Sequence, residues 1–268
     1  MTMMLSPDLL DRRALALIAL VDPLGRPLIG PARISGDGVR TAAKPSGRWA
    51  LLAAAGLESH VSAFAAAPAT PAQGAVGCAI DIRPYSGALA PRRAVVALPR
   101  DPDPDHKDQT DSLFAPVTIA LLPSPACPIP PTAAAVRVTV RKHGDGRRVA
   151  NALVRVASDN GQYAARSITD AAGEALVIVP SFPLAFTGNG GSVSDALPAK
   201  ASAVADPDKS VLVADEDVAA ARASAALLDG DYPDPDALAA AFTAPATGTA
   251  FQLSVRAVAT ADVEWRAP

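Results

Sequence analysis

The side chains that most often carry catalysis are few in this sequence and stand far apart. The three histidines are His60, His106 and His143, and each falls in a predicted loop or at a strand end. No H-E-x-x-H motif and no His/Cys pair at ligand spacing occurs, so a zinc site would need distant loops to meet. No G-x-S-x-G turn presents a serine nucleophile, and the glycine-rich segment 188–192 lacks the lysine of a phosphate loop. The sequence therefore predicts no catalytic residue, no metal and no cofactor.

Closely spaced aspartates are the clearest polar pattern, and they occur twice. The first group comprises Asp101, Asp103 and Asp105. These alternate as at the start of a calcium loop, but prolines separate them, and neither the glycine at position six nor the glutamate at position twelve follows. We therefore expect a solvated acidic loop over 99–111. The second group is interpreted as flanking and capping a short helix, and comprises Asp229, Asp231, Asp234 and Asp236.

Three other candidates were weighed for special chemistry. Lys142 and Glu174 could be cast in a Lys-Asn isopeptide bond, but Lys142 stands beside a predicted turn and no well-placed asparagine closes the domain. Trp49 is expected to pack in a core, whereas Trp265, near the end of the chain, is a candidate for an intermolecular contact. The functional surface is thus expected to be an interaction surface, with candidate residues Trp265, Phe251, Asp101, Asp103 and Asp105.

Composition excludes several classes of protein. Of the 268 residues 50% are hydrophobic but only 4% aromatic, so the cores must consist mostly of Val, Leu, Ile and Ala. The 26 prolines disfavour long helices and central parallel strands and favour an all-β class. A net charge of -3 gives no basic footprint for nucleic acid. No stretch approaches the roughly 20 apolar residues of a membrane helix, so no membrane insertion is predicted.

The beginning of the chain does not resemble a signal peptide. Acidic residues and Arg12-Arg13 precede an apolar run that extends only from 14 to 21. A signal needs a basic start, an apolar core of about seven to fifteen residues and a small-residue cleavage site. We therefore expect synthesis in the cytoplasm, with a released or envelope-associated particle as one destination. Cys78 and Cys127 are interpreted as thiols of a reduced intracellular protein, and a bridge between them stays open.

Short apolar or alternating runs separated by Gly and Pro turns recur about every ten residues, which is typical of sandwiches and barrels. Strands are predicted at 14–21, 28–34, 39–43, 48–54, 62–66, 75–82, 94–98, 117–122, 136–140, 149–156, 164–169 and 174–179, then within 200–213 and at 249–258 and 263–265. Both halves open with the same order of strands and glycine turns. Helices are predicted at 215–228 and from Asp234, and residues 123–132, with five prolines, are predicted to be a linker.

The turn residues of the two halves resemble the carboxypeptidase regulatory-like repeat, a transthyretin-like β-sandwich. The first copy carries Asp22, Gly25, Pro27, Leu28, Gly30, Thr41, Gly47 and Trp49, and the second carries Val149, Asn151, Ala152, Val154, Thr169, Asp170 and Gly173. The first copy departs from the family pattern at Lys44-Pro45-Ser46-Gly47, where an acid usually precedes the glycine.

The whole chain also resembles small carboxypeptidase regulatory-like proteins of contractile injection systems and related phage-tail-like particles. This second resemblance involves Arg92-Arg93 and the segments 98–104 and 112–117. It implies a part of a symmetric assembly that is loaded from the cytoplasm.

These observations together give one expectation of fold and two of function. The fold is mainly β, with two tandem transthyretin-like or Ig-like sandwich domains at 1–122 and 133–268 and a helical insertion at about 215–243. The expected function is a non-catalytic subunit of a phage-tail-like contractile particle, a cap, terminator or baseplate accessory whose partners are other protein subunits or further copies. The alternative is a surface or extracellular module that binds glycan or protein ligands.

Overall fold

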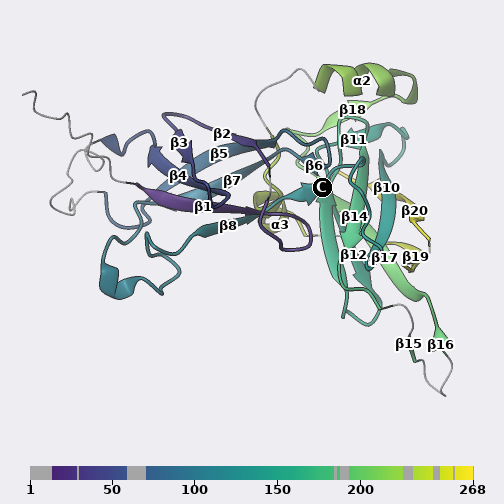
Figure 1. The fold of residues 1–268 in the computed structure, drawn as a ribbon. Helices are drawn as coiled ribbons and strands as arrows, with labels where there is room; N and C mark the ends of the chain where they lie inside the picture. Colours follow the sequence, from purple (N-terminus) through teal and green to yellow (C-terminus); the bar gives the residue numbers. More distant parts are fainter. Residues whose placement is uncertain are drawn as a thin grey trace, which may run out of the picture. The chain divides into compact units, whose positions relative to one another are not determined.

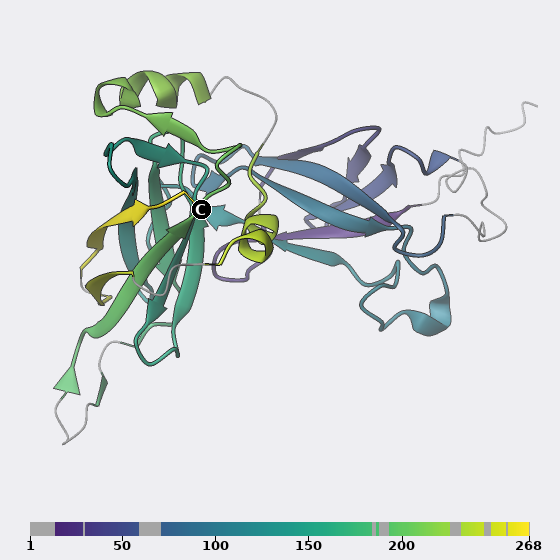
Figure 2. The same cartoon turned by 180° about the vertical axis from the view of Figure 1, so that it is seen from behind.

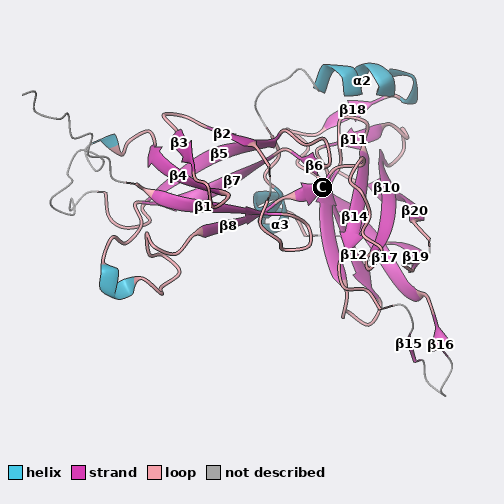
Figure 3. Cartoon of the chain, viewed as in Figure 1, coloured by secondary structure: helices cyan, strands magenta, loops and turns pink. Residues whose placement is uncertain are grey.

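The protein, described here from a computed structural model, is mainly β. The structure describes residues 14–28, 30–58, 71–183, 186–187, 193–225, 232–243, 248–255 and 257–267. Several sheets, most of whose strand pairs are antiparallel, are joined by turns, and short helices occur near the C-terminus (Figure 3). The chain forms two compact units. One comprises Met1–Leu20, Ile34–Ile80 and Val95–Ile119, and the other comprises Val21–Arg33, Asp81–Ala94 and Ala120–Pro268.

The first unit is built on strands of two sheets, with the orders β3-β4-β1-β8 and β2-β5-β7 (Figure 1). Their bounds are β1 Ala16–Val21, β2 Ala32–Ser35, β3 Arg40–Ala43, β4 Arg48–Ala53, β5 Val76–Pro84, β7 Arg92–Leu98 and β8 Val117–Ala120. Side chains alternate between buried and partly exposed along β1, as expected of a strand with one face in a core. Ile18 lies opposite Trp49, and both are buried, which confirms the prediction that Trp49 is a core residue.

The second unit is built mainly on two larger sheets. One has the order β14-β10-β11-β18 with β20 also paired to β10, and the other has the order β13-β12-β17-β19. The bounds are β10 Ala134–Lys142, β11 Arg148–Ala150, β12 Leu153–Ser158, β13 Ala164–Ile168, β14 Glu174–Val179, β17 Leu197–Val204, β18 Val211–Val213, β19 Thr249–Leu253 and β20 Ala259–Trp265. Valines of β10 and β12, together with alanines of β17, belong to one buried cluster. Because both sheets contribute to one core, this part is sandwich-like.

Two small sheets complete the second unit. β6 Leu89–Ala90 pairs with β9 Leu122–Pro123, and β15 Phe186–Thr187 pairs with β16 Val193–Ser194. Residues 124–132 of the predicted linker form no strand and lie within the second unit by their contacts. The domain boundaries proposed from the sequence stay a prediction.

The strand predicted at 149–156 is instead two strands, β11 and β12, which belong to different sheets. Asn151 between them has a φ of 63°, a left-handed conformation that ends a strand and that asparagine tolerates better than most residues. The hydroxyl of Thr169 donates to Val149 O and accepts from Ala152 N. These bonds satisfy backbone groups that the break would otherwise leave unpaired.

The C-terminal segment, predicted only as a short final strand at 263–265, is a longer strand in the structure. β20 extends from Ala259 to Trp265 and pairs in parallel with β10, from Val136 opposite Ala259 to Lys142 opposite Trp265. The apolar side chains Val263 and Trp265 on its inward face are buried. Burial of this face is the physical reason that the end of the chain is held in a sheet rather than loose.

The helices are shorter than predicted. The 3-10 turn η2 Asp215–Asp217 leads into α2 Val218–Ala225, and residues 226–228 of the predicted helix lie outside the described residues. Helix α3 Pro235–Ala241 begins as predicted, because Asp234 Oδ1 accepts hydrogen bonds from the backbone N–H groups of Asp236 and Ala237. Of the described helices, none is long and apolar enough to cross a membrane.

Candidate interaction surfaces

The predicted acidic loop is more ordered than its sequence suggests. Asp101 Oδ1 accepts from Asp103 N at 2.9 Å, and Asp103 Oδ1 accepts from Asp105 N at 2.9 Å. The second of these bonds caps a 3-10 turn, η1 Pro104–His106, within the segment expected to be irregular. Asp side chains form such turns by replacing a backbone acceptor. The three predicted carboxylates therefore differ in role, since Asp101 and Asp103 organise the loop and Asp105 stays exposed.

Asp101 also binds the histidine of the loop. Its Oδ2 lies 2.6 Å from His106 Nδ1. The hydrogen bonds from Asp103 N and His106 hold the pKa of Asp101 below its usual range. Conversely, the hydrogen bond to Asp101 raises the pKa of His106. Each partner stabilises the charged form of the other, so the pair is an ion pair at the pH values between the two pKa values.

The base of the loop is fastened to the rest of the unit. Asp101 bridges to Ser112, which is fully buried. Arg100 donates through Nε to Ser112 O at 2.9 Å and through Nη2 to Thr110 O. Beyond this base lies the aromatic ring of Phe114, 51% exposed. The loop thus presents carboxylates and one aromatic side chain from an internally hydrogen-bonded frame.

The two aromatic candidates near the C-terminus do not form a surface. Trp265 is 5% exposed and belongs to the buried cluster of the second unit. Phe251 on β19 is partly buried against the same cluster. Both were predicted as interaction residues, Trp265 because of its place near the end of the chain. Because β20 pairs along β10, the indole of Trp265 is instead a packing element.

The residues considered for catalysis or special bonds have ordinary polar partners where they are described. His143 Nδ1 lies 2.8 Å from Glu264, and Lys142 Nζ lies 3.5 Å from Asp145. His60, Asp229, Asp231 and the segments 1–13, 62–66 and 188–192 lie outside the described residues. Within the described ranges no group of three or more His, Cys, Asp or Glu side chains is placed to hold a metal ion.

Both cysteines are free thiols in the structure. Cys78 is buried and Cys127 is partly buried. Burial raises the pKa of each thiol, which keeps it in the protonated, unreactive form at neutral pH.

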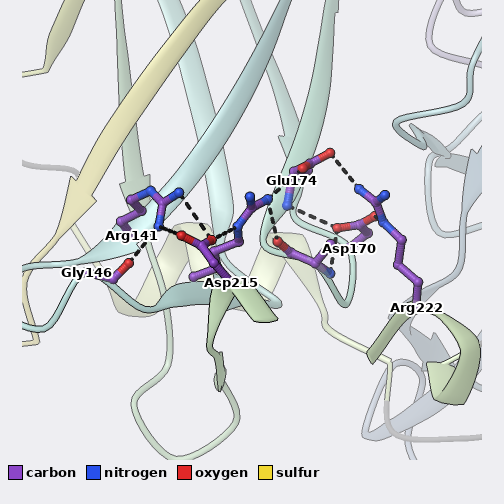
Figure 4. A network of polar contacts seen from close by, with 8 residues as sticks. Arg141, Gly146, Asp170, Glu174, Asp215 and Arg222 are labelled. Carbon is purple, nitrogen blue, oxygen red and sulfur yellow. Dashed lines mark hydrogen bonds and ion pairs between the residues drawn. The ribbon is translucent and has the colours of Figure 1, made fainter. Parts of the chain in front are cut away.

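Within the second unit, an arginine–carboxylate network joins η2 and α2 to strands β10, β11 and β14 (Figure 4). Arg148 Nε donates to Asp215 at 2.6 Å, and its Nη1 donates to Glu174 at 2.6 Å. Arg141 also donates to Asp215, and Arg222 of α2 donates to Glu174 at 2.7 Å. The hydrogen bond to Asp215 raises the pKa of Arg148, and those from Arg148 and Arg141 lower the pKa of Asp215.

These ion pairs attach the helical segment at both of its elements, through Asp215 of η2 and Arg222 of α2. None of the described side chains from 218 to 224 is buried, so the helix has little apolar packing to hold it. Figure 1 and Figure 2 both show α2 alongside β18 rather than over a sheet. A helix of eight residues is not stable by itself. We therefore infer that the ion pairs stabilise α2 in place of apolar packing.

A second cluster fastens helix α3. Arg92 is 1% exposed, and its Nη2 donates to Asp236 Oδ2 at 2.5 Å while Nη1 donates to Ala120 O at 2.7 Å. Arg166 donates to the other oxygen of Asp236 at 2.5 Å. Burial opposes ionisation of Asp236, but the hydrogen bonds from Arg92 and Arg166 outweigh it and lower its pKa.

Sequence reasoning missed both clusters. Arg92 had been noted only as part of a resemblance, and its partner Asp236 stands 144 residues later. No local pattern predicts a pair at that separation. A useful signal was the number of arginines near strand ends, since buried or half-buried guanidinium groups need carboxylate or carbonyl partners.

The second unit also contains a cavity of about 970 Å³. Apolar and aromatic side chains from α3 and neighbouring loops line it, among them Tyr85, Leu89, Tyr232, Leu238 and Phe242. Its volume is at the upper end of the range for small-ligand sites, about 300–1,000 Å³. The charged side chains on its wall include Arg93, which is paired with Asp81 at 2.8 Å.

Comparisons with known proteins give little further information. No protein-family profile matches this sequence, and no curated protein matches it. A crystal structure of a mutant of the shaft pilin SpaA from Lactobacillus rhamnosus GG aligns over 94% of this chain and 97% of the pilin chain, with 8% sequence identity and a TM-score of 0.22. A likeness at that TM-score supports no conclusion about this protein.

Proposed function

We propose that this chain is a non-catalytic structural subunit of a phage-tail-like contractile particle, acting as a cap, a terminator or a baseplate accessory. The observation that carries the proposal is the acidic loop at 101–114. Its frame is fixed by side-chain hydrogen bonds, while Asp105, Asp108 and Phe114 project into solvent. Ordering a contact surface before binding lowers the entropy that association costs, which suits a part that must dock on neighbouring subunits.

The proposal includes two transthyretin-like modules, and the turns at equivalent places in the two halves support it. In the first, Lys44 N donates to Arg48 O and Gly47 N donates to Lys44 O. In the second, Asp170 N donates to Glu174 O and Gly173 N donates to Asp170 O. Both glycines have a φ near 70°. The lysine that departs from the family pattern therefore stands in a turn with the same backbone hydrogen bonds.

The proposed partners are other protein subunits, made in the same cytoplasm and joined there. We expect the full chain to co-sediment with particles reconstituted from the sheath, tube and baseplate proteins of neighbouring genes. Replacing Asp105, Asp108 and Asp111 together by lysine reverses the charge of the loop and should reduce co-sedimentation at least about tenfold, because like charges then oppose docking. Asp208→Lys is the matched control, since this exposed acid lies in the other unit.

The result that contradicts the proposal is a chain that stays free in solution with every mixture of these subunits. If the charge-reversed variant still joins the particles, the acidic loop is not part of the interface.

A second candidate function, a module that binds glycan or protein ligands, is favoured by the aromatic-lined cavity of the second unit. Aromatic rings bind sugars and apolar side chains by stacking. Screening the full chain on a glycan array, followed by the variant Tyr232→Ala, tests it. Binding that disappears in this variant supports the alternative, and no binding to any glycan on the array counts against its glycan form.

A further inference from the structure

Strand β7 lies at the end of its sheet and is open along one side. It is the terminal strand in the order β2-β5-β7, and of the described residues none pairs with it as a further strand. Near its start Arg93 N donates to Pro233 O, so the backbone groups of Arg93 point away from β5. Residues two positions apart in a strand point the same way. The N–H and C=O groups of Val95 and Ala97 therefore also face the open side.

This edge lacks the features that usually prevent strands from pairing. Proteins protect edges with charged side chains, prolines, bulges or short strands. Among the other terminal strands, β2, β3 and β20 carry Arg33, Arg40 and Glu264, whereas β8, β18 and β19 are uncharged but only four, three and five residues long. Strand β7 has seven residues and carries charge only at its start, at Arg92 and Arg93, while the segment 94–98 reads Ala-Val-Val-Ala-Leu and contains no charge and no proline.

The exposed side chains beside this edge are also small and uncharged. Val95 is 59% exposed, and a Cβ added at Gly77 of β5 would lie 3.2 Å from a Val95 methyl carbon. Gly77, Ala79 and Ala97 are exposed with it. Small side chains leave room for a neighbouring strand to approach the edge, and an apolar edge of this kind left in water promotes association.

We propose that the segment Ala94–Leu98 pairs in antiparallel fashion with the same segment of a second copy, so that two sheets become one across a two-fold axis. This deepens the assembly role proposed above by naming a partner and an interface. A second copy fits because the edge is self-complementary. Around an axis at Val96, the N–H and C=O of Val95 meet those of Ala97 of the second copy. No like charges come together, because this stretch has none.

Light scattering coupled to size exclusion of the full chain tests this pairing over about 1–100 μM, where standard interfaces are populated. We expect a species of twice the chain mass of 27.1 kDa. Val95→Lys places like charges across the axis, and Ala97→Pro removes an N–H that the sheet of a single chain does not use. Both variants should be monomeric, with the melting temperature within a few degrees of the unmodified chain.

Ala79→Lys is the matched control, because it charges the same exposed face one strand away from the edge. It should still dimerise. The proposal is overturned by an unmodified chain that is monomeric throughout, by dimers that persist in both edge variants, or by dimers lost in Ala79→Lys alone. Co-sedimentation with particles separates this inference from the proposed function, since a monomeric chain that still joins particles would refute only the β7 pairing.

Discussion

The buried guanidinium of Arg92 and the half-exposed carboxylate of Asp236 meet at 2.5 Å, and this contact ties strand β7 to helix α3. The pair is unequal, because Arg92 is enclosed by the protein whereas the side chain of Asp236 is 58% exposed. Losing the carboxylate leaves a buried cation whose remaining carboxylate partner, Asp234, is 3.9 Å away. Losing the cation leaves a carboxylate that still has Arg166 and solvent. The two partners should therefore respond differently to substitution.

We expect Asp236→Asn to lower the free energy of unfolding by about 2 kcal/mol. The cost is below the roughly 3–5 kcal/mol of a fully buried pair because one partner is solvated. Arg166→Ala, which removes the exposed partner of the same carboxylate, should cost less than about 1 kcal/mol. Calorimetry of both variants measures the difference. Equal losses of stability in the two variants would mean that buried Arg92 does not require Asp236 as its counterion.

The pH dependence of this contact has a definite sign. The pKa of Asp236 is lowered in the folded protein, so its stabilisation is fully present above the unfolded pKa, about 3.9. It is lost as the pH falls through the lower folded value. Asp236→Asn should thus destabilise the protein at pH 7, and the destabilisation should shrink as the pH falls below the unfolded value of about 3.9. An effect that does not change as the pH is lowered would contradict this linkage.

The ion pair in the acidic loop should be visible by NMR. We expect the pKa of His106 to lie above the ordinary value of about 6.5 and to fall toward it in Asp101→Asn, since Asp101 is the main cause of the shift. Asp108→Asn, an exposed acid in the same loop, should move it less. A His106 titration unaffected by Asp101→Asn would show that the two side chains do not interact in solution.

The stability of the loop should follow the same titrations. His106 contributes below its unfolded pKa, and this contribution is lost as the pH rises through the raised folded pKa. Asp101 contributes above its unfolded pKa and loses this as the pH falls through its lowered folded pKa. The loop amides should be most protected from exchange between the two folded values. Protection that rises steadily with pH above the His106 value, after correction for intrinsic exchange, would contradict the pair.

Helix α2 should depend on salt more than the sandwich does. Arg148→Ala removes the shared donor of Asp215 and Glu174, and we expect amide exchange over 215–225 to rise roughly two- to fivefold, as for exposed pairs. Raising salt from about 0.05 M to about 0.5 M should act in the same direction. Arg137→Ala is the control, because among the described residues this β10 arginine donates only to Pro125 O. Unchanged exchange in Arg148→Ala would mean that the network does not hold the helix.

Trp265 should behave as a core residue. Trp265→Ala should lower the free energy of unfolding by about 3–5 kcal/mol, as do other large-to-small changes in cores, and Trp265→Phe should cost less. Chemical denaturation measures both. A Trp265→Ala variant that stays stable but fails to join particles would show that Trp265 acts in the interaction surface and not in the core.

The sequence predicted strands best where local signals suffice. Alternation and turn glycines located β1, β3, β4, β13 and β14 to within two residues, because side-chain period and positive φ are local properties. The same signals predicted one strand where the structure has two, β11 and β12. The break occurs at Asn151, whose left-handed conformation cannot be recognised from an asparagine within an apolar run. The sequence also predicted only a short strand at 263–265 where β20 extends over seven residues, because its partner β10 precedes it by more than a hundred residues.

The candidate surface was predicted only in part. Asp101, Asp103 and Asp105 are indeed in one loop. The hydrogen bonds that order this loop, notably those of Asp101 with His106 and of Arg100 with Ser112, depend on how the loop folds back on itself and could not be predicted from the sequence. The open edge of β7 could not be predicted at all. Whether a strand is central or terminal depends on the order of strands in the sheet, which a single sequence does not reveal.

Electron microscopy of native particles shows whether this chain is the structural subunit that we propose. Particles are purified from producing cells that carry a C-terminally tagged chain, and the tag is labelled with gold. We predict label at one defined position on the particles. Particles without label, from cells in which the tagged chain sediments as free protein, would contradict the account.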